Sequence, residues 1–194
     1  INWLAPRPGR TLLDVGGGTG DIAFRFLERG GGSVTVVDIN EEMLKQGRDR
    51  AIDRGILESI EWVEGDAEKL PLADASKDAY TTAFCIRNVT RIDKALEEAH
   101  RVLKPGGRFL CLEFSQVALP LLGKLYEAYS FKVLPFLGAK VAGDKDAYQY
   151  LAESIRRFPQ ATHVARLLGK AGFAGVRVNA LSAGVASLHS AWRV

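Results

Sequence analysis

The chain has 194 residues, with 26 Lys and Arg against 23 Asp and Glu, a formal net charge of +3 and 47% hydrophobic residues. A chain of this length buries about 70% of the surface that its unfolded form exposes, so it needs neither disulfides nor a metal to fold. Two cysteines are too few for a disulfide scaffold, the three histidines lack metal-ligand spacing, so that no metal is expected, and no apolar run is long enough to span a membrane.

The first half of the chain alternates the patterns of strand and helix. Apolar or β-branched runs predict strands at Thr11–Val15, Ser33–Asp38, Ile60–Glu64, Ala79–Phe84 and Arg108–Phe114. Helical patterns lie between them at Asp21–Arg29, Glu41–Asp53, with Asn40 as its N-cap, and Ile92–Leu103, which we expect Lys104–Gly107 to end. This alternation predicts a parallel sheet covered by helices on both faces.

The second half departs from this alternation. Residues 117–157 form a long, mostly helical insertion, and a helix returns at Gln160–Ala171. Two strands follow, Ala174–Leu181 and Gly184–Val194, and the two residues between them permit only an antiparallel hairpin. The sequence therefore predicts a single domain, residues 1–194, whose parallel sheet ends in a reversed strand. Because the first residue is Ile1 rather than Met, we expect a further segment before it.

A glycine-rich loop, "DVGGGTGD" at Asp14–Asp21, joins the first strand to the first helix. Glycines there let the backbone approach a ligand closely, and the helix N-terminus favours negative charge. The loop alone is ambiguous, because Gly18–Ala23 also fits the G-x-G-x-x-A pattern of dinucleotide-binding proteins.

Acidic residues favour S-adenosylmethionine (SAM) over a nicotinamide or flavin nucleotide. Asp14 can meet the ammonium group of an amino-acid moiety, whereas Asp21 would repel a pyrophosphate at the helix start. Asp66, after the third strand, can accept a hydrogen bond from an adenine amino group, or it is a turn residue. Asp38 ends the second strand and suits ribose hydroxyls, which both kinds of cofactor have. Met43 is either a core residue or an adenine contact.

A set of motifs, in order along the chain, resembles one family. They are "DVGGGTGD", "DIN", "GDAEKLP", "IRNVT", "RVLKPGG", "LEFS", "YSFKVLP", "YLAESI" and "AGVASLH". Together they resemble the ubiquinone/menaquinone biosynthesis C-methyltransferases (UbiE type) over nearly all of the chain. The first five are typical of class I methyltransferases in general, whereas "RNVT", "YSFKVLP" and "YLAESI" are more specific.

The resemblance implies a Rossmann-like class I fold: a mostly parallel seven-stranded sheet with an antiparallel last strand and a helical insertion over the active site. It implies SAM-dependent methylation of a ring carbon of a polyprenyl benzoquinol or naphthoquinol. The cofactor-binding positions that it implies are Thr19, Asp38, Asp66 and Ala67, with Gly16 and Gly18 in the loop itself.

The chain departs from the family pattern at two neighbouring sites and at its start. Gly16 stands where the family usually has Ala, a change that we expect to be tolerated. Ala83–Ile86 stands where the family has Ser-Phe-Gly-Leu, so Ala83 must lose the cofactor contact of that serine hydroxyl. The family's N-terminal helix, which helps to close the site, is absent.

Arg87 and Asn88 are the candidate catalytic residues, because they follow the fourth strand at the edge where open α/β sheets bind ligands. A phenol has a pKa near about 10, so a reacting quinol ring needs a cation or a base nearby at neutral pH. Arg87 can stabilise an oxyanion or orient a water molecule, and Asn88 can hydrogen-bond a ring oxygen. The alternative for Arg87 is a structural ion pair with a nearby acidic residue.

Several polar residues in and after the insertion are spaced to reach a cavity over the sheet, and packing or surface ion pairs would explain them as well. They are Tyr126, Tyr129, Tyr148, Glu153 and Arg156. For His189, in the last strand, we expect a core or surface position. We expect the apolar residues of the insertion to shape a channel for the polyprenyl tail and to touch the membrane. Packing on the sheet or a dimer interface is the alternative.

Residues 100–194 carry 13 Lys and Arg against 5 Asp and Glu, whereas residues 1–99 carry 13 against 18. This excess favours a protein at the cytoplasmic face of the membrane, and a solvated basic face explains it equally well.

Other functions remain open from the sequence. The acceptor can be another lipophilic molecule, such as a sterol or a phenol, or the chain can be a SAM-binding module without catalysis. A nucleic-acid methyltransferase is disfavoured, because the basic residues are scattered and no aromatic platform accompanies them. The partners that we expect are a polyprenylated quinol and either a second copy of the chain or a quinone-biosynthesis assembly.

Overall fold

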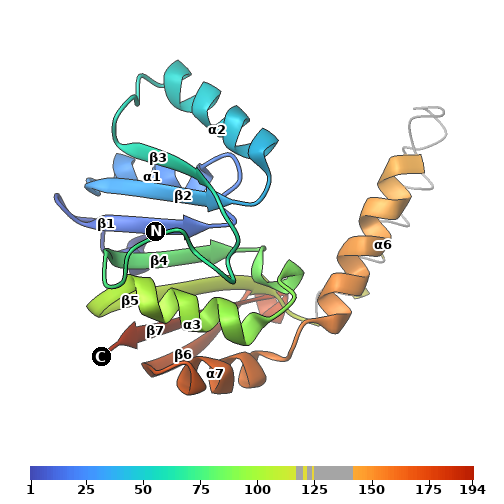
Figure 1. Ribbon diagram of the computed structural model, residues 1–194. Coiled ribbons are helices and arrows are strands. Elements are labelled where there is room, and N and C mark those ends of the chain that lie inside the picture. The colour runs from blue at the N-terminus through green and yellow to red at the C-terminus, as the bar shows by residue number, and fades with distance from the viewer. Residues whose placement is uncertain (117–119, 122–123, 125–141) are drawn as a thin grey trace.

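The computed structural model describes residues 1–116, 120–121, 124 and 142–194. Its centre is a seven-stranded sheet in the order β3-β2-β1-β4-β5-β7-β6 (Figure 1). The strands are β1 (Thr11–Val15), β2 (Ser33–Asp38), β3 (Ile60–Glu64), β4 (Lys77–Ala83), β5 (Leu103–Phe114), β6 (Phe173–Leu181) and β7 (Ala186–Arg193). Strands β1 to β5 pair in parallel, and β7 runs antiparallel to both of its neighbours, as the short hairpin connection predicts.

The helices are α1 (Asp21–Glu28), α2 (Glu41–Asp53), α3 (Ile92–Val102), α6 (Ala142–Arg157) and α7 (Ala161–Lys170), with short 3-10 turns η1 (Asn2–Leu4), η2 (Ile86–Asn88) and η4 (Ser182–Gly184). The helices that the sequence predicts on either side of the insertion are therefore present, and α6 lies in the described part of the insertion. Asn40 caps α2 as predicted, because its side chain accepts hydrogen bonds from the backbone N–H groups of Glu42 and Met43. Helix α6 projects from the body of the molecule (Figure 1), and Ile155, near its C-terminal end, is buried.

The structure corrects the predicted bounds of β4 and β5. Helix α3 ends at Val102, as expected, but the prediction that the next strand begins at Arg108 is wrong, because Lys104–Gly107 belong to β5. Gly106 has a φ of 77°, and the register of β5 on β4 shifts between Lys77 and Ala79, so an irregular stretch is accommodated within the strand. Strand β4 ends at Ala83, because the next residue, Phe84, has a φ of 55°.

The core is divided by the sheet into two clusters. Alternate residues of β1 face opposite clusters, with Leu12 in one and Leu13 in the other, as the period of a strand requires. Helices α3 and α7 contribute to the cluster of Leu13, and helices α1 and α2 to the cluster of Leu12. Because β1 to β4 are parallel, their carboxyl ends and the loops that follow them lie at one edge of the sheet.

Trp62 of β3 fills a space that two glycines leave beside it. A Cβ atom on Gly20, before α1, would lie 2.5 Å from the indole, and a Cβ atom on Gly47, within α2, would lie 2.3 Å from it. The ring also contacts Phe24 of α1, with 6.4 Å between the ring centroids. The indole therefore packs against the start of α1 and the middle of α2 and holds both helices at the edge of the sheet.

We predict that Gly47→Ala destabilises the protein by about 1–3 kcal/mol, although Ala favours a helix, because the added methyl group overlaps Trp62. The matched control is Gly169→Ala in α7, where no heavy atom lies within 4 Å of the added Cβ. This control should stabilise the protein by up to about 1 kcal/mol. Urea unfolding measures both, and equal effects of the two substitutions would contradict the role of Trp62.

Candidate active site

The glycine loop is tied to the end of β2 by its backbone. The N–H of Gly16 donates to the carbonyl oxygen of Val37 at 2.7 Å, and the N–H of Gly18 donates to Oδ2 of Asp38 at 2.9 Å. Gly16 and Gly18 have φ angles of 65° and 53°, which glycine adopts without steric cost. The other oxygen of Asp38 accepts from the N–H of Asn40 at 2.9 Å. Asp38 therefore shapes the loop as well as facing the site.

Asp14 lies beneath this loop and is 1% exposed. The hydroxyl of Thr81 donates to its Oδ1 at 2.7 Å, whereas its Oδ2 is buried and has no hydrogen-bond donor among the described residues. The pKa of Asp14 is raised to about 7, mainly by burial; the hydrogen bond from Thr81 lowers it, and the nearby carboxylates of Asp38 and Asp21 contribute to the rise. An unpaired carboxylate oxygen in this position is suited to a cationic group of a ligand.

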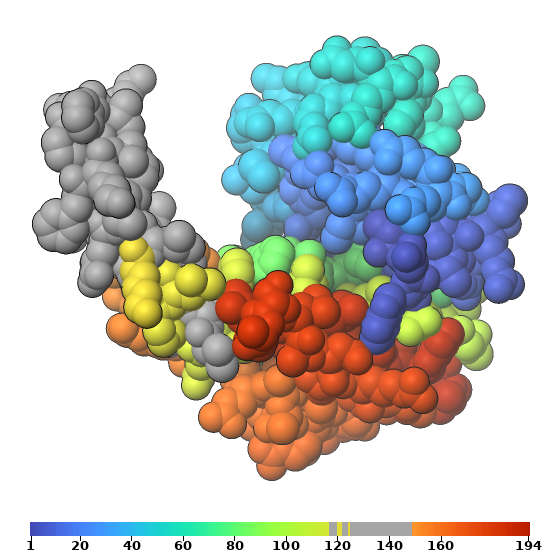
Figure 2. Space-filling model, turned by 180° about the vertical axis from the view of Figure 1, so that it is seen from behind, coloured from blue at the N-terminus to red at the C-terminus, as the bar shows by residue number. Residues whose placement is uncertain are grey.

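Two cavities meet at the loop. The smaller, of about 170 Å³, lies at the ends of β2 and β3 and is lined by Asp38, Ile39, Asp66, Ala67 and Asn88 among others. The larger, of about 610 Å³, extends from Asp14 toward η1 and the β6–β7 hairpin, which lie side by side in Figure 2. Its further lining includes Ala83, Phe84 and several leucines. Gly16 lines both cavities.

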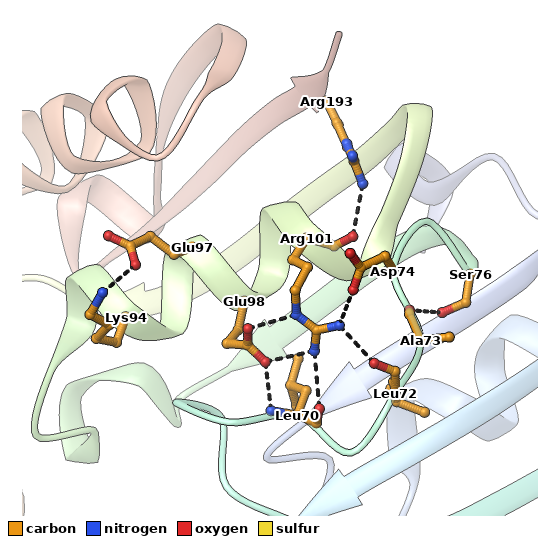
Figure 3. Close-up of polar contacts among 10 residues, drawn as sticks. All are labelled: Leu70, Leu72, Ala73, Asp74, Ser76, Lys94, Glu97, Glu98, Arg101 and Arg193. Atoms are coloured by element: carbon orange, nitrogen blue, oxygen red, sulfur yellow. Dashed lines mark hydrogen bonds and ion pairs between the residues drawn. The ribbon is translucent and has the colours of Figure 1, made fainter.

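Asp66 is both a turn residue and a cavity residue. Its Oδ1 accepts from the N–H of Glu68 at 2.9 Å, which closes a turn, and its side chain also lines the smaller cavity. The loop that follows is held by Arg101 of α3, which donates to the carbonyl oxygens of Leu70 and Leu72 and pairs with Glu98 (Figure 3). Arg101 therefore helps to fix the loop that follows Asp66.

Arg87 forms a buried ion pair with Glu113 of β5. Its Nη1 lies 3.0 Å from Oε2 of Glu113, and the two side chains are 10% and 0% exposed. Burial raises the pKa of Glu113, although the charge of Arg87 opposes this effect. Nε of Arg87 is buried and has no acceptor among the described residues. The ion pair that was the alternative for Arg87 is therefore present, and the guanidinium still has a hydrogen-bond donor to offer.

The turn between β4 and η2 is strained at Phe84. A bulky residue with a φ of 55° is a conformational outlier that costs on the order of 1–3 kcal/mol. This backbone conformation places Phe84 in the wall of the larger cavity. The centroid of its ring lies 4.4 Å from the centroid of the Phe114 ring. The guanidinium of Arg87 lies 5.6 Å from the centroid of the same Phe114 ring. Arg87 does not line either cavity in the described structure; it contacts Phe114, which in turn packs on Phe84 in the wall of the larger cavity.

Asn88 connects the cofactor side of the site to the helical insertion. It lines the smaller cavity, and the hydroxyl of Tyr150 in α6 donates to its Oδ1 at 3.0 Å. The structure thus brings Asn88 together with Asp38, Asp66 and Ala67, while Arg87 lies on the other side of the same 3-10 turn.

The remaining predicted residues lie at varied distances from the cavities. Thr19 lines neither cavity, and its hydroxyl accepts a hydrogen bond from Arg50, which also pairs with Asp21 at 2.9 Å. Met43 is not a core residue, because it is 37% exposed and its methyl group lies close to Gly18.

In the C-terminal half, His189 is a core residue, 0% exposed, with Nε2 3.2 Å from the carbonyl oxygen of Ala161. Glu153 and Arg156 are exposed. Tyr126, Tyr129 and the side chain of Tyr148 lie outside the described residues.

Several residues of the site were missed by the sequence analysis. Glu113 is an acidic residue in the otherwise apolar stretch Phe109–Phe114, and that isolated charge was a usable signal. Ile39 is 73% exposed directly after Asp38 and lines the smaller cavity. Cys85 also lines that cavity.

Comparison with known proteins agrees with this geometry. A model described as the ubiE/COQ5 methyltransferase family matches residues 1–193. A "Ubiquinone/menaquinone biosynthesis C-methyltransferase UbiE" of Brucella abortus (strain S19) is 56% identical over 198 residues, which cover 100% of this chain and 74% of the relative.

Solved structures share the fold at low identity. A SAM-dependent methyltransferase from Mesorhizobium loti has a TM-score of 0.72 at 18% identity, over 99% of this chain and 94% of that chain. A Haemonchus contortus phosphoethanolamine N-methyltransferase 2 in complex with S-adenosyl-L-methionine has a TM-score of 0.73 at 16% identity, over 99% and 50%.

We predict that SAM binds about tenfold more weakly at pH 6 than at pH 8, because the raised pKa of Asp14 leaves its carboxyl mostly protonated at the lower pH. Asp14→Asn should bind SAM weakly at both pH values. Isothermal titration calorimetry measures the affinities. Asp21→Asn should keep the pH dependence but move it to slightly lower pH, because it removes one of the charges that raise the pKa of Asp14.

The same carboxyl should make the unliganded protein less stable as the pH rises. Its pKa is about 7 in the folded state and 3.8 ordinarily, so the folded state binds the proton more tightly and the free energy of unfolding falls between about pH 4 and pH 7. This component should be missing from Asp14→Asn. A native protein and a variant with parallel stability–pH curves would contradict the assignment.

Proposed function

This chain belongs to the ubiE/COQ5 methyltransferase family, and from that premise we propose how its described residues hold the two reactants. The chain is a SAM-dependent C-methyltransferase of ubiquinone or menaquinone biosynthesis. Its substrate is of the quinone type, and the finer assignment that we propose is a ring carbon of a polyprenyl benzoquinol or demethylmenaquinol.

The residues at the edge of the sheet fit SAM. Oδ2 of Asp14, buried and unpaired, suits the ammonium group of the amino-acid moiety. Asp38 suits the ribose hydroxyls, and Asp66, with Ala67 and Ile39 beside it, suits the adenine. When bound, SAM supplies an electrophilic methyl group. The observation that carries the proposal is that Gly16 lines both cavities, so the cofactor cavity and the larger cavity meet at the loop.

The larger cavity suits the acceptor ring. Its walls are mostly apolar and include Leu110, Leu112 and Leu188, which exclude water from the reaction. Phe84 offers a ring face on which an aromatic ring can stack. The volume of about 610 Å³ is within the usual range of small-molecule sites. Holding the ring in this cavity places it next to the glycine loop, and such positioning is the main contribution to the rate.

Arg87 is proposed to stabilise the negative charge that develops on the acceptor oxygen. Glu113 holds the guanidinium through Nη1, and the buried Nε has no acceptor in the part of the chain that the structure describes. A cation that is already held in a poorly hydrated site stabilises a developing oxyanion without further reorganisation. We assign Asn88 a second hydrogen bond, oriented by Tyr150. The ring proton leaves to water that Arg87 orients.

The experiment that tests this function is incubation of the protein with SAM and a reduced quinone extract. Mass spectrometry should show a quinol that is heavier by one methylene unit, together with S-adenosylhomocysteine. Phenols and sterols without the quinol ring serve as competing acceptors. Methylation of these molecules, with none of the quinol, would overturn the proposed acceptor.

Among the described residues, no helix is long and apolar enough to cross a membrane. We propose peripheral contact with the cytoplasmic membrane surface, because the polyprenyl tail resides there and Arg156 and Arg157 are exposed at the end of α6. The channel that we expect in the insertion, residues 117–157, depends on apolar residues that lie mostly outside the described residues. A homodimer or a quinone-biosynthesis assembly is also part of the proposal. Co-sedimentation with anionic liposomes tests the membrane contact, and native mass spectrometry tests the assembly.

We predict that Arg87→Lys lowers kcat by about a hundredfold and leaves the affinity for SAM within about twofold, because the lysine keeps the charge but lacks the planar guanidinium and its Nε donor. The matched control is Arg91→Lys, because the side chain of Arg91 is 63% exposed in its ion pair with Glu68. It should retain full turnover. Unchanged turnover in Arg87→Lys would assign Arg87 to structure alone.

A further inference from the structure

A side chain at position 16 would occupy the same space as the side chain of Cys85, where the two cavities meet. A Cβ atom built on Gly16 would lie 2.1 Å from Sγ of Cys85 and 2.4 Å from its Cβ. Apolar atoms in contact are normally about 4 Å apart. The side chain of Cys85 therefore fills the space that any side chain at position 16 requires.

This contact joins the two chain segments that flank the cofactor site. Gly16 is fixed to β2 through its N–H, which donates to the carbonyl oxygen of Val37 at 2.7 Å. Cys85 begins η2, and its carbonyl oxygen accepts from the N–H of Asn88 at 2.9 Å. Both residues line the smaller cavity. A change in their contact would move the glycine loop relative to the turn that carries Arg87 and Asn88.

We propose that Gly16 and Cys85 are a matched pair that sets the width of the site where the two cavities meet, and that Cys85 is a positioning residue for SAM. The proposal rests on the proposed function, because it takes SAM to occupy this site. It assigns to Cys85 a role in the geometry of the cofactor pocket rather than in the chemistry.

The state of the thiol agrees with this role. Burial raises the pKa of Cys85 to about 11, so the group is a neutral thiol at physiological pH. The thiolate is the nucleophilic form of cysteine. A neutral Cys85 therefore forms part of the pocket wall without competing with the quinol ring for the methyl group.

The test is a double-mutant cycle of Gly16→Ala and Cys85→Gly, with Gly16→Ala combined with Cys85→Ala as a third arm. Gly16 has a φ of 65°, so any substitution there also strains the backbone. That strain is common to Gly16→Ala and to both double variants, so it cancels in their comparison. Gly30→Ala is the control for strain alone, because Gly30 has a φ of 83° and no heavy atom lies within 4 Å of an added Cβ.

We expect Gly16→Ala to weaken SAM binding by more than about tenfold, and Cys85→Gly to weaken it by about threefold to tenfold. Gly16→Ala/Cys85→Gly should return to within about threefold of the native protein. Gly16→Ala/Cys85→Ala should remain as weak as Gly16→Ala, since the alanine retains the Cβ that would lie 2.4 Å away. For Cys85→Gly, the KM for SAM should rise while kcat at saturating SAM stays close to native.

Three results would overturn the proposal: additive effects of the two substitutions, equal rescue by Ala and Gly at position 85, or coupling in thermal stability without coupling in SAM affinity. The last would make the pair structural only. A native protein that does not bind SAM at all would overturn the proposed function instead, and the stability cycle would still report whether the two residues compete for space.

Discussion

The burial of Asp14 is the constraint on which the rest of the site depends. Its carboxyl lies at the centre of a parallel sheet, between β2 and β4, with one oxygen bonded to Thr81 and the other without a donor among the described residues. Ionising such a group costs free energy, which is why its pKa is raised to about 7. A cationic ligand removes that cost by pairing with it, so the folded protein is more stable with its cofactor than without it. Affinity for the cofactor and low stability of the empty site thus have the same origin.

The polar groups at the two ends of the sheet differ in their surroundings. At the amino ends of the strands, Asp78 accepts hydrogen bonds from Thr11 and from Lys104, both at 2.8 Å. At the carboxyl ends, Asp14 and Arg87 each have a buried polar atom without a partner among the described residues, and the backbone of Phe84 is strained. Unfavourable features persist only where the surrounding structure holds them in place. These features lie beside two cavities, whereas Nε of Arg108, also buried without a partner among the described residues, lies toward the amino ends, where the guanidinium packs on Trp3 and Trp192.

The sequence predicted the parts of this structure that depend on local patterns. Strand and helix order, the antiparallel hairpin, and the acidic residues at the ends of β1, β2 and β3 all follow from short stretches of chain. Contacts between distant residues left no such pattern: Arg87 and Glu113 are 26 residues apart, and Asn88 and Tyr150 are 62 apart. The tolerance expected for Gly16 was argued from size alone. Its environment depends on Cys85, and both positions depart from the family pattern, a coincidence that only the contact between them explains.

The ion pair of Arg87 and Glu113 shows why a structural and a catalytic interpretation of one residue need not exclude each other. An unpaired arginine at this depth would lose its hydration without compensation, and the cost would be several kcal/mol. Glu113 provides the compensation through Nη1, and Nε has no acceptor among the described residues. The opposite charges of the pair allow its burial, and under the proposed function the same guanidinium stabilises charge on the acceptor, although it lines neither cavity. Removing Glu113 would therefore affect catalysis through the position of Arg87, although Glu113 itself touches neither cavity.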